Sequence, residues 1–261
     1  MRHALLLMLI SLLPLGAQAE REVQVWTYHQ IPPFILDQQR QQGLSFDLLQ
    51  LLNQHADNHG RFRFRLHALP RKRLDRNLSR GLPGLVLWVS PIFFDDPQGQ
   101  RYQWTAPLLH DQQEFLSREE RPFSYQGPAS LHGRILGGVL GHQYIGLQAD
   151  IDKGLIRRED VLHDEQNLNK LLSKRLDLIL MPRSTVLFYS QQMGLDGQLY
   201  FSPTPLSRFS RQLLLQPSLE PEIRAFLQTV VGSLADNPQW RQLLHKYGLD
   251  RSTRPADASL R

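Results

Sequence analysis

The sequence contains no cysteine, which excludes disulfide bonds, thiolate metal ligands and a nucleophilic thiol. It also contains no HExxH zinc motif, no GxSxG nucleophile motif and no glycine-rich phosphate loop. Among its ten histidines, only His55 and His59 have a spacing that could hold a metal, and a solvated helix end explains them more simply. We therefore expect no metal, no cofactor and no catalytic activity.

Long apolar runs are also scarce. Residues 4–15 form one, but it is too short to cross a bilayer as a permanent helix. Arg2 and His3 precede it, and Ala17-Gln18-Ala19 follows with the small-x-small pattern that signal peptidase cuts. We predict a signal peptide over residues 1–19, with a retained anchor as the alternative. Without a cysteine after the run, a bacterial lipid anchor is excluded.

An exported chain without disulfides is typical of the bacterial periplasm, which argues against a nucleic-acid partner. About 240 residues remain after cleavage, enough for one large domain or two lobes, with no further membrane-spanning segment. Without Arg2 the chain carries 29 Lys and Arg against 25 Asp and Glu. This excess favours an anionic ligand or a negatively charged membrane surface, or reflects solubility alone.

Apolar patterning predicts that strands alternate with helices along the chain. The expected strands are 23–27, 62–66, 84–89, 134–139 and 176–181. The expected helices are 43–53, one opening at Pro70, one starting within 144–149, 166–174, 184–193, 221–234 and 237–247. This alternation is typical of parallel sheets, and its restart near residue 134 indicates two lobes. Residues 251–261 are expected to form a disordered tail.

Five segments carry a resemblance to a known family. They are VWTYHQIPPF (25–34), GLSFDLLQLLNQ (43–54), RYQWTAPLL (101–109), SLHGRILGGVLG (130–141) and DNPQWRQLLHKYGL (236–249). In this order they resemble periplasmic solute-binding protein family 3, the polar amino-acid-type substrate-binding proteins of ABC transporters. The resemblance covers about residues 22–249.

The resemblance implies an α/β, two-lobed periplasmic binding protein fold of type II, with two sheets flanked by helices and joined by a two-segment hinge. Lobe 1 would comprise 20–110 and 209–250, and lobe 2 would comprise 111–208. The hinge segments would lie near 109–118 and 205–214. The ligand would bind between the lobes, beyond the carboxyl ends of the strands.

In lobe 1 the resemblance places Tyr28, Phe34, Trp88 and Ser90 at the cleft. Phe34 would offer an aromatic face and Ser90 a hydrogen bond to a ligand carboxylate, although Phe34 and Trp88 also suit an ordinary core. Arg101 is the nearest match to the carboxylate-binding arginine of the family, because a guanidinium fork meets two oxygens at once. Its spacing from Ser90 is longer than in the family, and a surface salt bridge is the alternative.

In lobe 2 the resemblance places His142 and Gln143 where the family has a small pair at a helix N-terminus, a position that suits anions. Tyr28 and Pro182 occupy the two positions where the family has ammonium-binding carboxylates. Arg183 follows and would favour an anion if it points into the cleft. A small anionic or polar compound is therefore expected, rather than a standard α-amino acid.

The expected function is capture of this solute by a monomeric periplasmic protein that delivers it to an inner-membrane ABC permease. Two alternatives stay open. One is a ligand sensor for a membrane signalling partner. The other is a dehydratase-like enzyme on the same fold, for which His142 is the one candidate acid or base.

Overall fold

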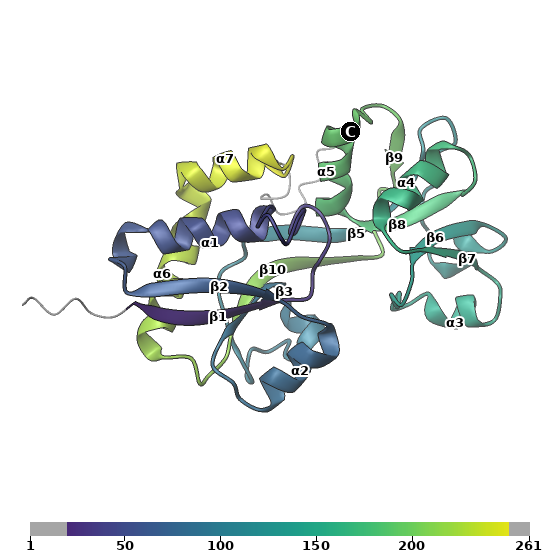
Figure 1. The fold of residues 1–261 in the computed structure, drawn as a ribbon. Coiled ribbons are helices and arrows are strands. Elements are labelled where there is room, and N and C mark those ends of the chain that lie inside the picture. The colour runs from purple at the N-terminus through teal and green to yellow at the C-terminus, as the bar shows by residue number, and fades with distance from the viewer. Residues whose placement is uncertain (1–19, 251–261) are drawn as a thin grey trace, which may run out of the picture.

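The computed structural model describes residues 20–250, so the predicted signal peptide and the predicted tail lie outside the described residues. Its strands follow the order β2-β1-β3-β10-β5-β8-β6-β7, with β4 paired to β10 and β9 paired to β5 (Figure 1). The strands are β1 (Arg21–Thr27), β2 (Phe62–Ala68), β3 (Leu85–Val89), β4 (Gln103–Trp104), β5 (Leu109–Arg118), β6 (Ile135–Val139), β7 (Arg157–Val161), β8 (Leu178–Pro182), β9 (Leu199–Phe201) and β10 (Ser207–Leu215). No helix within residues 20–250 is long and apolar enough to cross a bilayer.

One half of the molecule, the β1 half, is built on β1, which pairs in parallel with both β2 and β3. Side chains alternate across this sheet, so Val25 and Trp26 enter different cores on its two faces. Helices α1 (Leu44–Gln54), α6 (Pro221–Ser233) and α7 (Pro238–Lys246) cover one face, and α2 (Arg71–Ser79) covers the other (Figure 1). All four tryptophans of the chain lie in these two cores: Trp26, Trp88, Trp104 and Trp240.

The other half, the β6 half, is built on β6, which pairs in parallel with β7 and β8. Its helices are α3 (Gln148–Asp152), α4 (Asp164–Leu172) and α5 (Arg183–Met193). Gly137 on β6 leaves no room for a side chain, because a Cβ there would lie 2.5 Å from Leu176 Cδ1. This close approach lets the amide of Asn167 on α4 donate to the Gly138 carbonyl at 2.9 Å.

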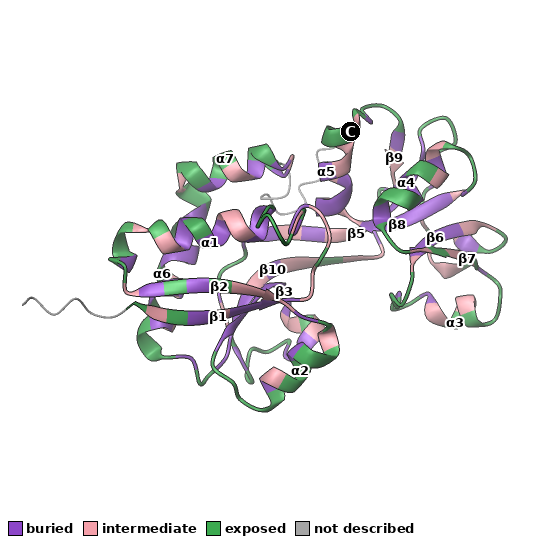
Figure 2. Cartoon of the chain, in the orientation of Figure 1, coloured by how far each residue is buried: buried purple, intermediate pink, exposed green. Residues whose placement is uncertain are grey.

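Two antiparallel strands, β5 and β10, connect the halves. Residues Ser207 to Arg211 of β10 pair with β5, and the rest of β10 pairs with β3 and β4. Helix α5 adds a second connection, because Phe188 belongs to the core of the β1 half and the Thr185 hydroxyl donates to the Pro32 carbonyl at 2.9 Å. Figure 2 shows buried residues in the strands of both halves, with many intermediate residues where β5 and β10 connect them.

The structure contains every strand and helix expected from the apolar patterning, with one helix displaced. The helix expected to start within residues 144–149 begins only at Gln148, and turns precede it. The patterning missed β4, β7 and β9, and β5 and β10 were expected only as hinge segments, from the resemblance. Strand β7 pairs only with β6 at the edge of the sheet, so its side chains are mostly exposed or half-buried and its sequence carries no apolar run.

Candidate functional site

A buried aromatic pair lies where β1 and β3 end. Phe34 and Trp88 are almost completely buried, with ring centroids 4.9 Å apart, and the Trp88 indole N–H donates to Ser45 Oγ at 2.8 Å. Trp88 has a φ of 64°, at a bulge where the pairing of β3 with β10 shifts its register. A bulky residue keeps such a conformation only when its surroundings hold it there. The pair therefore belongs to the core and also forms a fixed surface of the candidate site. We call this surface, formed by Phe34 and Trp88, the floor.

Arg211 on β10 packs on this floor, and the sequence analysis did not identify it. It is 2% exposed, and its guanidinium carbon lies 4.6 Å from the centroid of the Phe34 ring. Its Nε donates to Asp111 Oδ2 at 2.6 Å, and its Nη1 donates to the Trp88 carbonyl at 3.1 Å. Within residues 20–250, Nη2 has no hydrogen-bond partner and is not among the buried unpaired atoms. This nitrogen is therefore a free donor.

Asp111 on β5 connects three elements. Besides Arg211, it accepts hydrogen bonds from the backbone N–H and the hydroxyl of Ser184, at 3.0 and 2.7 Å. Both Asp111 and Ser184 are buried, and Ser184 lies in the first turn of α5. The two connecting strands and the helix of the β6 half are therefore joined at a single carboxylate.

His29 is the one ring beside this floor with an unused polar atom. It lies in the loop after β1, with its ring 5.9 Å from that of Phe34, and its Nε2 is buried without a hydrogen-bond partner among the described residues. Burial lowers the pKa of His29 well below its usual value, and the charges of Arg211 and Arg71 lower it further. No carboxylate is among the groups that shift this pKa. The imidazole is therefore neutral at pH 7 in a positive field.

Arg71, at the start of α2, fixes the neighbouring aromatic rings. Its guanidinium carbon lies 4.3 Å from the Phe94 ring centroid and 5.2 Å from that of Tyr28. It donates to the Phe93 carbonyl at 2.9 Å and to Asp75 at 2.8 Å. Burial raises the pKa of the Tyr28 phenol, which therefore stays neutral at pH 7 and offers a hydroxyl.

The facing wall, from the β6 half, is more open. His142 and Gln143 follow β6 and are exposed. The His142 ring lies 4.8 Å from the Tyr144 ring, and this crowding, together with the charge of Arg158, lowers the His142 pKa even though part of the ring reaches solvent. His142 is also among the groups that lower the pKa of His29.

Apolar side chains stand out from the same wall. Leu140 is 66% exposed, Ile145 is 81% exposed and Leu162 is 65% exposed. Leu140 and Leu162 follow Val139 and Val161, which are paired across β6 and β7. The carboxyl edge of this sheet therefore presents a loose apolar rim around His142.

Arg183 carries an ion pair. Its Nη1 lies 2.6 Å from Glu114 Oε1, and Glu114 is fully buried on β5. The same carboxylate oxygen accepts from the amide of Gln112 at 2.5 Å. Burial raises the pKa of Glu114, although the hydrogen bonds from Gln112 and Arg183 act in the opposite direction and lower it. Arg183 is thus partly neutralised.

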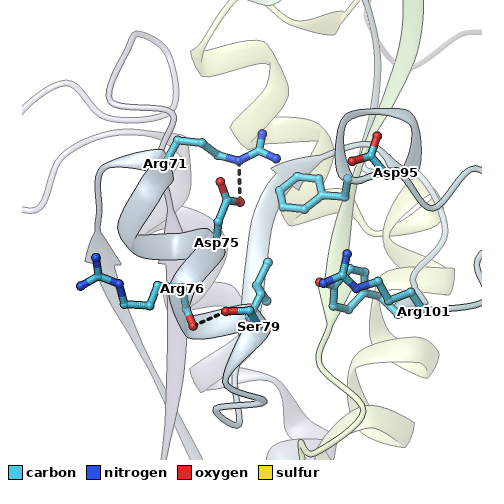
Figure 3. Close-up of a pocket in the computed structure, with 9 residues that line it drawn as sticks. Arg71, Asp75, Arg76, Ser79, Asp95 and Arg101 are labelled. Carbon is cyan, nitrogen blue, oxygen red and sulfur yellow. Dashed lines mark hydrogen bonds and ion pairs between the residues drawn. The ribbon is translucent and has the colours of Figure 1, made fainter.

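Ser90 and Arg101 lie differently. Ser90 is buried directly after β3, beside the floor residue Trp88. Arg101 is exposed, with its guanidinium 5.0 Å from the Tyr102 ring. It lines a depression of about 380 Å³ whose opposite wall is Arg71 and Asp75 (Figure 3). The structure shows no contact between Arg101 and the residues around His29.

The candidate site is defined by its side chains. The depression beside Arg101 and a second one of about 560 Å³ both lie along α2. Within residues 20–250, no group of three His, Asp or Glu side chains is arranged to hold a metal ion. One further buried acid was not foreseen: burial raises the pKa of Asp164, at the start of α4, to about 6.

No family model matches the sequence, and a search of curated proteins finds no match. Solved structures do match. The ligand-binding core of GluR0 from Nostoc punctiforme, in complex with L-glutamate, is 18% identical with a TM-score of 0.61, covering 87% of this chain and 99% of that one. The L-cystine solute receptor of Neisseria gonorrhoeae, unliganded and open, is 16% identical with a TM-score of 0.61, covering 91% and 97%.

A third similar structure is the ancestral amino acid-binding protein AncCDT-1, described as a precursor of cyclohexadienyl dehydratase. It is 14% identical with a TM-score of 0.59, and the match covers 87% of this chain and 94% of that one. These likenesses confirm the α/β, two-lobed fold of solute-binding proteins that the sequence resemblance implies.

Proposed function

We propose that this chain captures a small polar or anionic solute between its two halves and delivers it to an inner-membrane ABC transporter. The observation that carries the proposal is His29: a neutral imidazole with an unpaired, buried Nε2, in the field of two arginines, at the carboxyl end of a parallel strand. A buried polar atom of this kind is costly unless a partner completes it. A bound solute is the partner that the fold favours.

The chemistry of the partner follows from the groups around His29. The neutral imidazole accepts at Nε2 from a ligand hydroxyl or amide in one tautomer, and donates from Nε2 to a ligand oxygen in the other. The free Nη2 of Arg211 and the hydroxyl of Tyr28 add donors. Both carboxylates near the floor already have a cation partner, Asp111 in Arg211 and Glu114 in Arg183. Glu114 uses only Oε1 for this pair, and its Oε2 is buried without a hydrogen-bond partner among the described residues. The two nearby carboxylate charges are therefore already balanced, which favours a polar or anionic ligand over an ammonium group.

The remaining parts of the proposal follow from the resemblance and the fold. The lobes would be 20–110 with 209–250, and 111–208, with β5 and β10 as the hinge. The binding residues would be Tyr28, His29, Phe34, Trp88, Ser90 and Arg211 from the first lobe, with His142, Gln143 and the paired Arg183 from the second. The chain would act as a periplasmic monomer after cleavage near Ala19.

A thermal-shift screen of residues 20–261 tests the ligand class. The panel contains small carboxylates, inorganic phosphate, neutral polar compounds and the standard amino acids, because similar structures are described with glutamate and as a cystine receptor. A ligand at 100 times its Kd adds about 2.7 kcal/mol to the free energy of unfolding. We expect a carboxylate or another polar non-amino-acid compound to give this shift. A shift produced by a standard α-amino acid would contradict the proposed ligand class.

A variant pair then tests the site. His29→Gln should weaken binding of the identified ligand at least tenfold, while His245→Gln, an exposed residue on α7, should leave it unchanged. Equal affinity in both variants would place the ligand elsewhere.

A specific observation keeps the enzyme alternative testable. Asp164 and His142 both have shifted pKa values and lie on the β6 half, and shifted pKa values cluster at catalytic sites. Incubating the purified protein with the identified ligand and analysing the mixture by mass spectrometry decides this point. Recovery of unchanged ligand supports binding alone, and conversion would replace the transport proposal by an enzymatic one.

A further inference from the structure

Charge is distributed unevenly over the molecule. Residues 20–250 carry 26 Lys and Arg against 24 Asp and Glu, while residues 71–80, which span α2, carry five against one. The rest of the described chain is therefore slightly acidic, and its positive excess is concentrated on one helix. At and just before β2, in the same half, the arginines Arg61, Arg63 and Arg65 each pair with a glutamate.

Four cations of α2 have no such partner. Arg71 pairs with Asp75, but among the described residues the side chains of Lys72, Arg73, Arg76 and Arg80 make no ion pair or hydrogen bond, and all four residues are exposed. We call these four residues the α2 patch. Leu74 and Leu78 hold the opposite side of the helix in the core, so the patch faces away from the protein. Arg76 also lines the depression beside Arg101, and in Figure 3 its guanidinium points away from Arg101.

The arrangement works against the stability of the helix. Lys72, Arg76 and Arg80 follow at intervals of four residues, where like charges repel each other on a helix surface. The first turn contains Lys72 and Arg73 and no acidic residue, although the helix dipole disfavours cations there. Selection for stability alone would remove both the repulsion and the unfavourable cations in the first turn by substituting neutral or acidic residues. The charges are therefore better explained by a partner outside the chain.

The shape of the patch is consistent with that interpretation. A shallow depression of about 560 Å³ is lined by the four cations with Pro70 and Asn77, and no carboxylate lines it. Leu82, just past the end of the helix, is 40% exposed and offers an apolar contact beside the cations. Exposed Lys and Arg around an exposed leucine are typical of surfaces that lie on a lipid headgroup layer.

We propose that the α2 patch docks the protein on an anionic phospholipid surface, with the lipid phosphates as the groups it binds. An extended surface is favoured over a single small anion, because none of the four cations is buried and each alone binds a phosphate weakly. Near an anionic membrane each Lys or Arg contributes about 1 kcal/mol, so four acting together give useful affinity. The inference is independent of the solute that binds between the halves.

Vesicle flotation of residues 20–261 tests the proposal. Vesicles of phosphatidylglycerol and phosphatidylcholine in equal parts should carry the protein at physiological salt, and vesicles of phosphatidylcholine alone should not. Salt at about 1 M should abolish binding, because the screening length then falls to about 3 Å. The variant K72Q/R73Q/R76Q/R80Q should lose roughly 1,000-fold in vesicle affinity, as expected for four lost cations.

A matched control removes the same net charge elsewhere. The variant R63Q/R65Q/R121Q/R157Q changes four exposed arginines that each pair with an acidic residue, and it should bind vesicles as the unmodified protein does. Thermal unfolding verifies that both variants fold, and the α2 variant should melt no lower than the unmodified protein because it relieves repulsion. An equal loss in both variants would mean that net charge alone drives binding, and would overturn the proposal.

Two further arms separate the other sources of negative charge. Competition by millimolar inorganic phosphate would indicate a small-anion site in place of a membrane surface. Failure to float with anionic vesicles, combined with binding to poly-glutamate that the α2 variant abolishes, would assign the patch to an acidic protein face. Either result overturns the lipid proposal, and neither affects the ligand screen of the proposed function.

Discussion

The two walls of the candidate site are built in opposite ways. On the β1 half, Phe34, Trp88 and Arg211 are at most 2% exposed and held by named partners. On the β6 half, His142 and Gln143 are exposed and Ile145 is 81% exposed. The first wall is set when the protein folds, because its residues are also core residues. The second wall makes few contacts and can adjust to what binds.

This difference separates two roles, maintaining the fold and contacting the ligand, that a single residue often combines. A substitution in the first wall changes the fold and the site together, so its effect on binding is hard to isolate. A substitution in the second wall leaves the core intact, and its effect on binding can be measured directly. The following predictions use this contrast, from the largest expected effect to the smallest.

The largest effect is expected at the buried ion pair. Arg211→Met leaves the Asp111 carboxylate buried without its cation, so the free energy of unfolding should fall by about 3–5 kcal/mol. Urea unfolding measures this loss. The double variant R211M/D111L should be less destabilised than Arg211→Met alone, because no charge is then stranded. If Arg211→Met costs less than about 1 kcal/mol, the first wall is not the rigid one.

A buried acid in the β6 half gives the next largest effect, with the opposite sign. The pKa of Asp164 is raised from 3.8 to about 6, so the folded state holds its proton more tightly than the unfolded state. Stability is therefore lost as pH rises from about 4 to above 6. Asp164→Asn should raise the free energy of unfolding by about 1–2 kcal/mol at pH 7 and change it little at pH 4. An equal change at both pH values would show that the effect is unrelated to ionisation.

His29 gives a pH dependence of the opposite direction in the first wall. Because its pKa is well below 6.5 in the folded state, the unfolded state takes up the proton first as pH falls. Stability should be lost below about pH 6.5, and His29→Gln should flatten this part of the stability curve. Urea unfolding between pH 5 and 8 measures both curves. His245→Gln serves as the control, and a flattening of the same size there would assign the slope to another group.

The smallest effects on stability are expected in the second wall. Gln143→Ala and Ile145→Ser change exposed side chains, so each should alter the free energy of unfolding by less than about 0.5 kcal/mol. The same variants should still weaken binding of the ligand found by the thermal-shift screen. Isothermal titration measures the affinity. A large loss of stability in either variant would show that the two walls do not differ as described.

The sequence predicted elements that carry their own apolar signal. The run 84–89 became β3, and the leucines within 166–174 lie on the buried side of α4. The sequence did not predict β7, because its residues RREDV lie at a sheet edge and show no apolar alternation. At the candidate site, Phe34 and Trp88 were predicted from the family resemblance. Arg211 was not, because its partner Asp111 lies 100 residues away and single-sequence patterns do not reveal such pairs.

Arg183 and Arg101 show the same limit. An arginine after a strand suggests a free cation, but Arg183 meets Glu114 from a segment 69 residues earlier. For Arg101, the residues between it and Ser90 form a turn that carries it toward α2 and Tyr102. Motif spacing alone does not show where such an insertion takes the side chain. A signal for Arg211 was present nonetheless, since a run of three leucines follows Gln212, and an arginine at the start of a buried strand end requires a partner.

The placement of the tryptophans makes the molecule its own optical reporter. All four lie in the cores of the β1 half, so tryptophan fluorescence does not report directly on the β6 half. Trp88 forms the floor of the candidate site and stacks on Trp240 at 6.5 Å, so a solute arriving above it should alter the emitted light without any added dye. If the halves melt at different temperatures, fluorescence will record one midpoint while circular dichroism, which sees the whole backbone, records two.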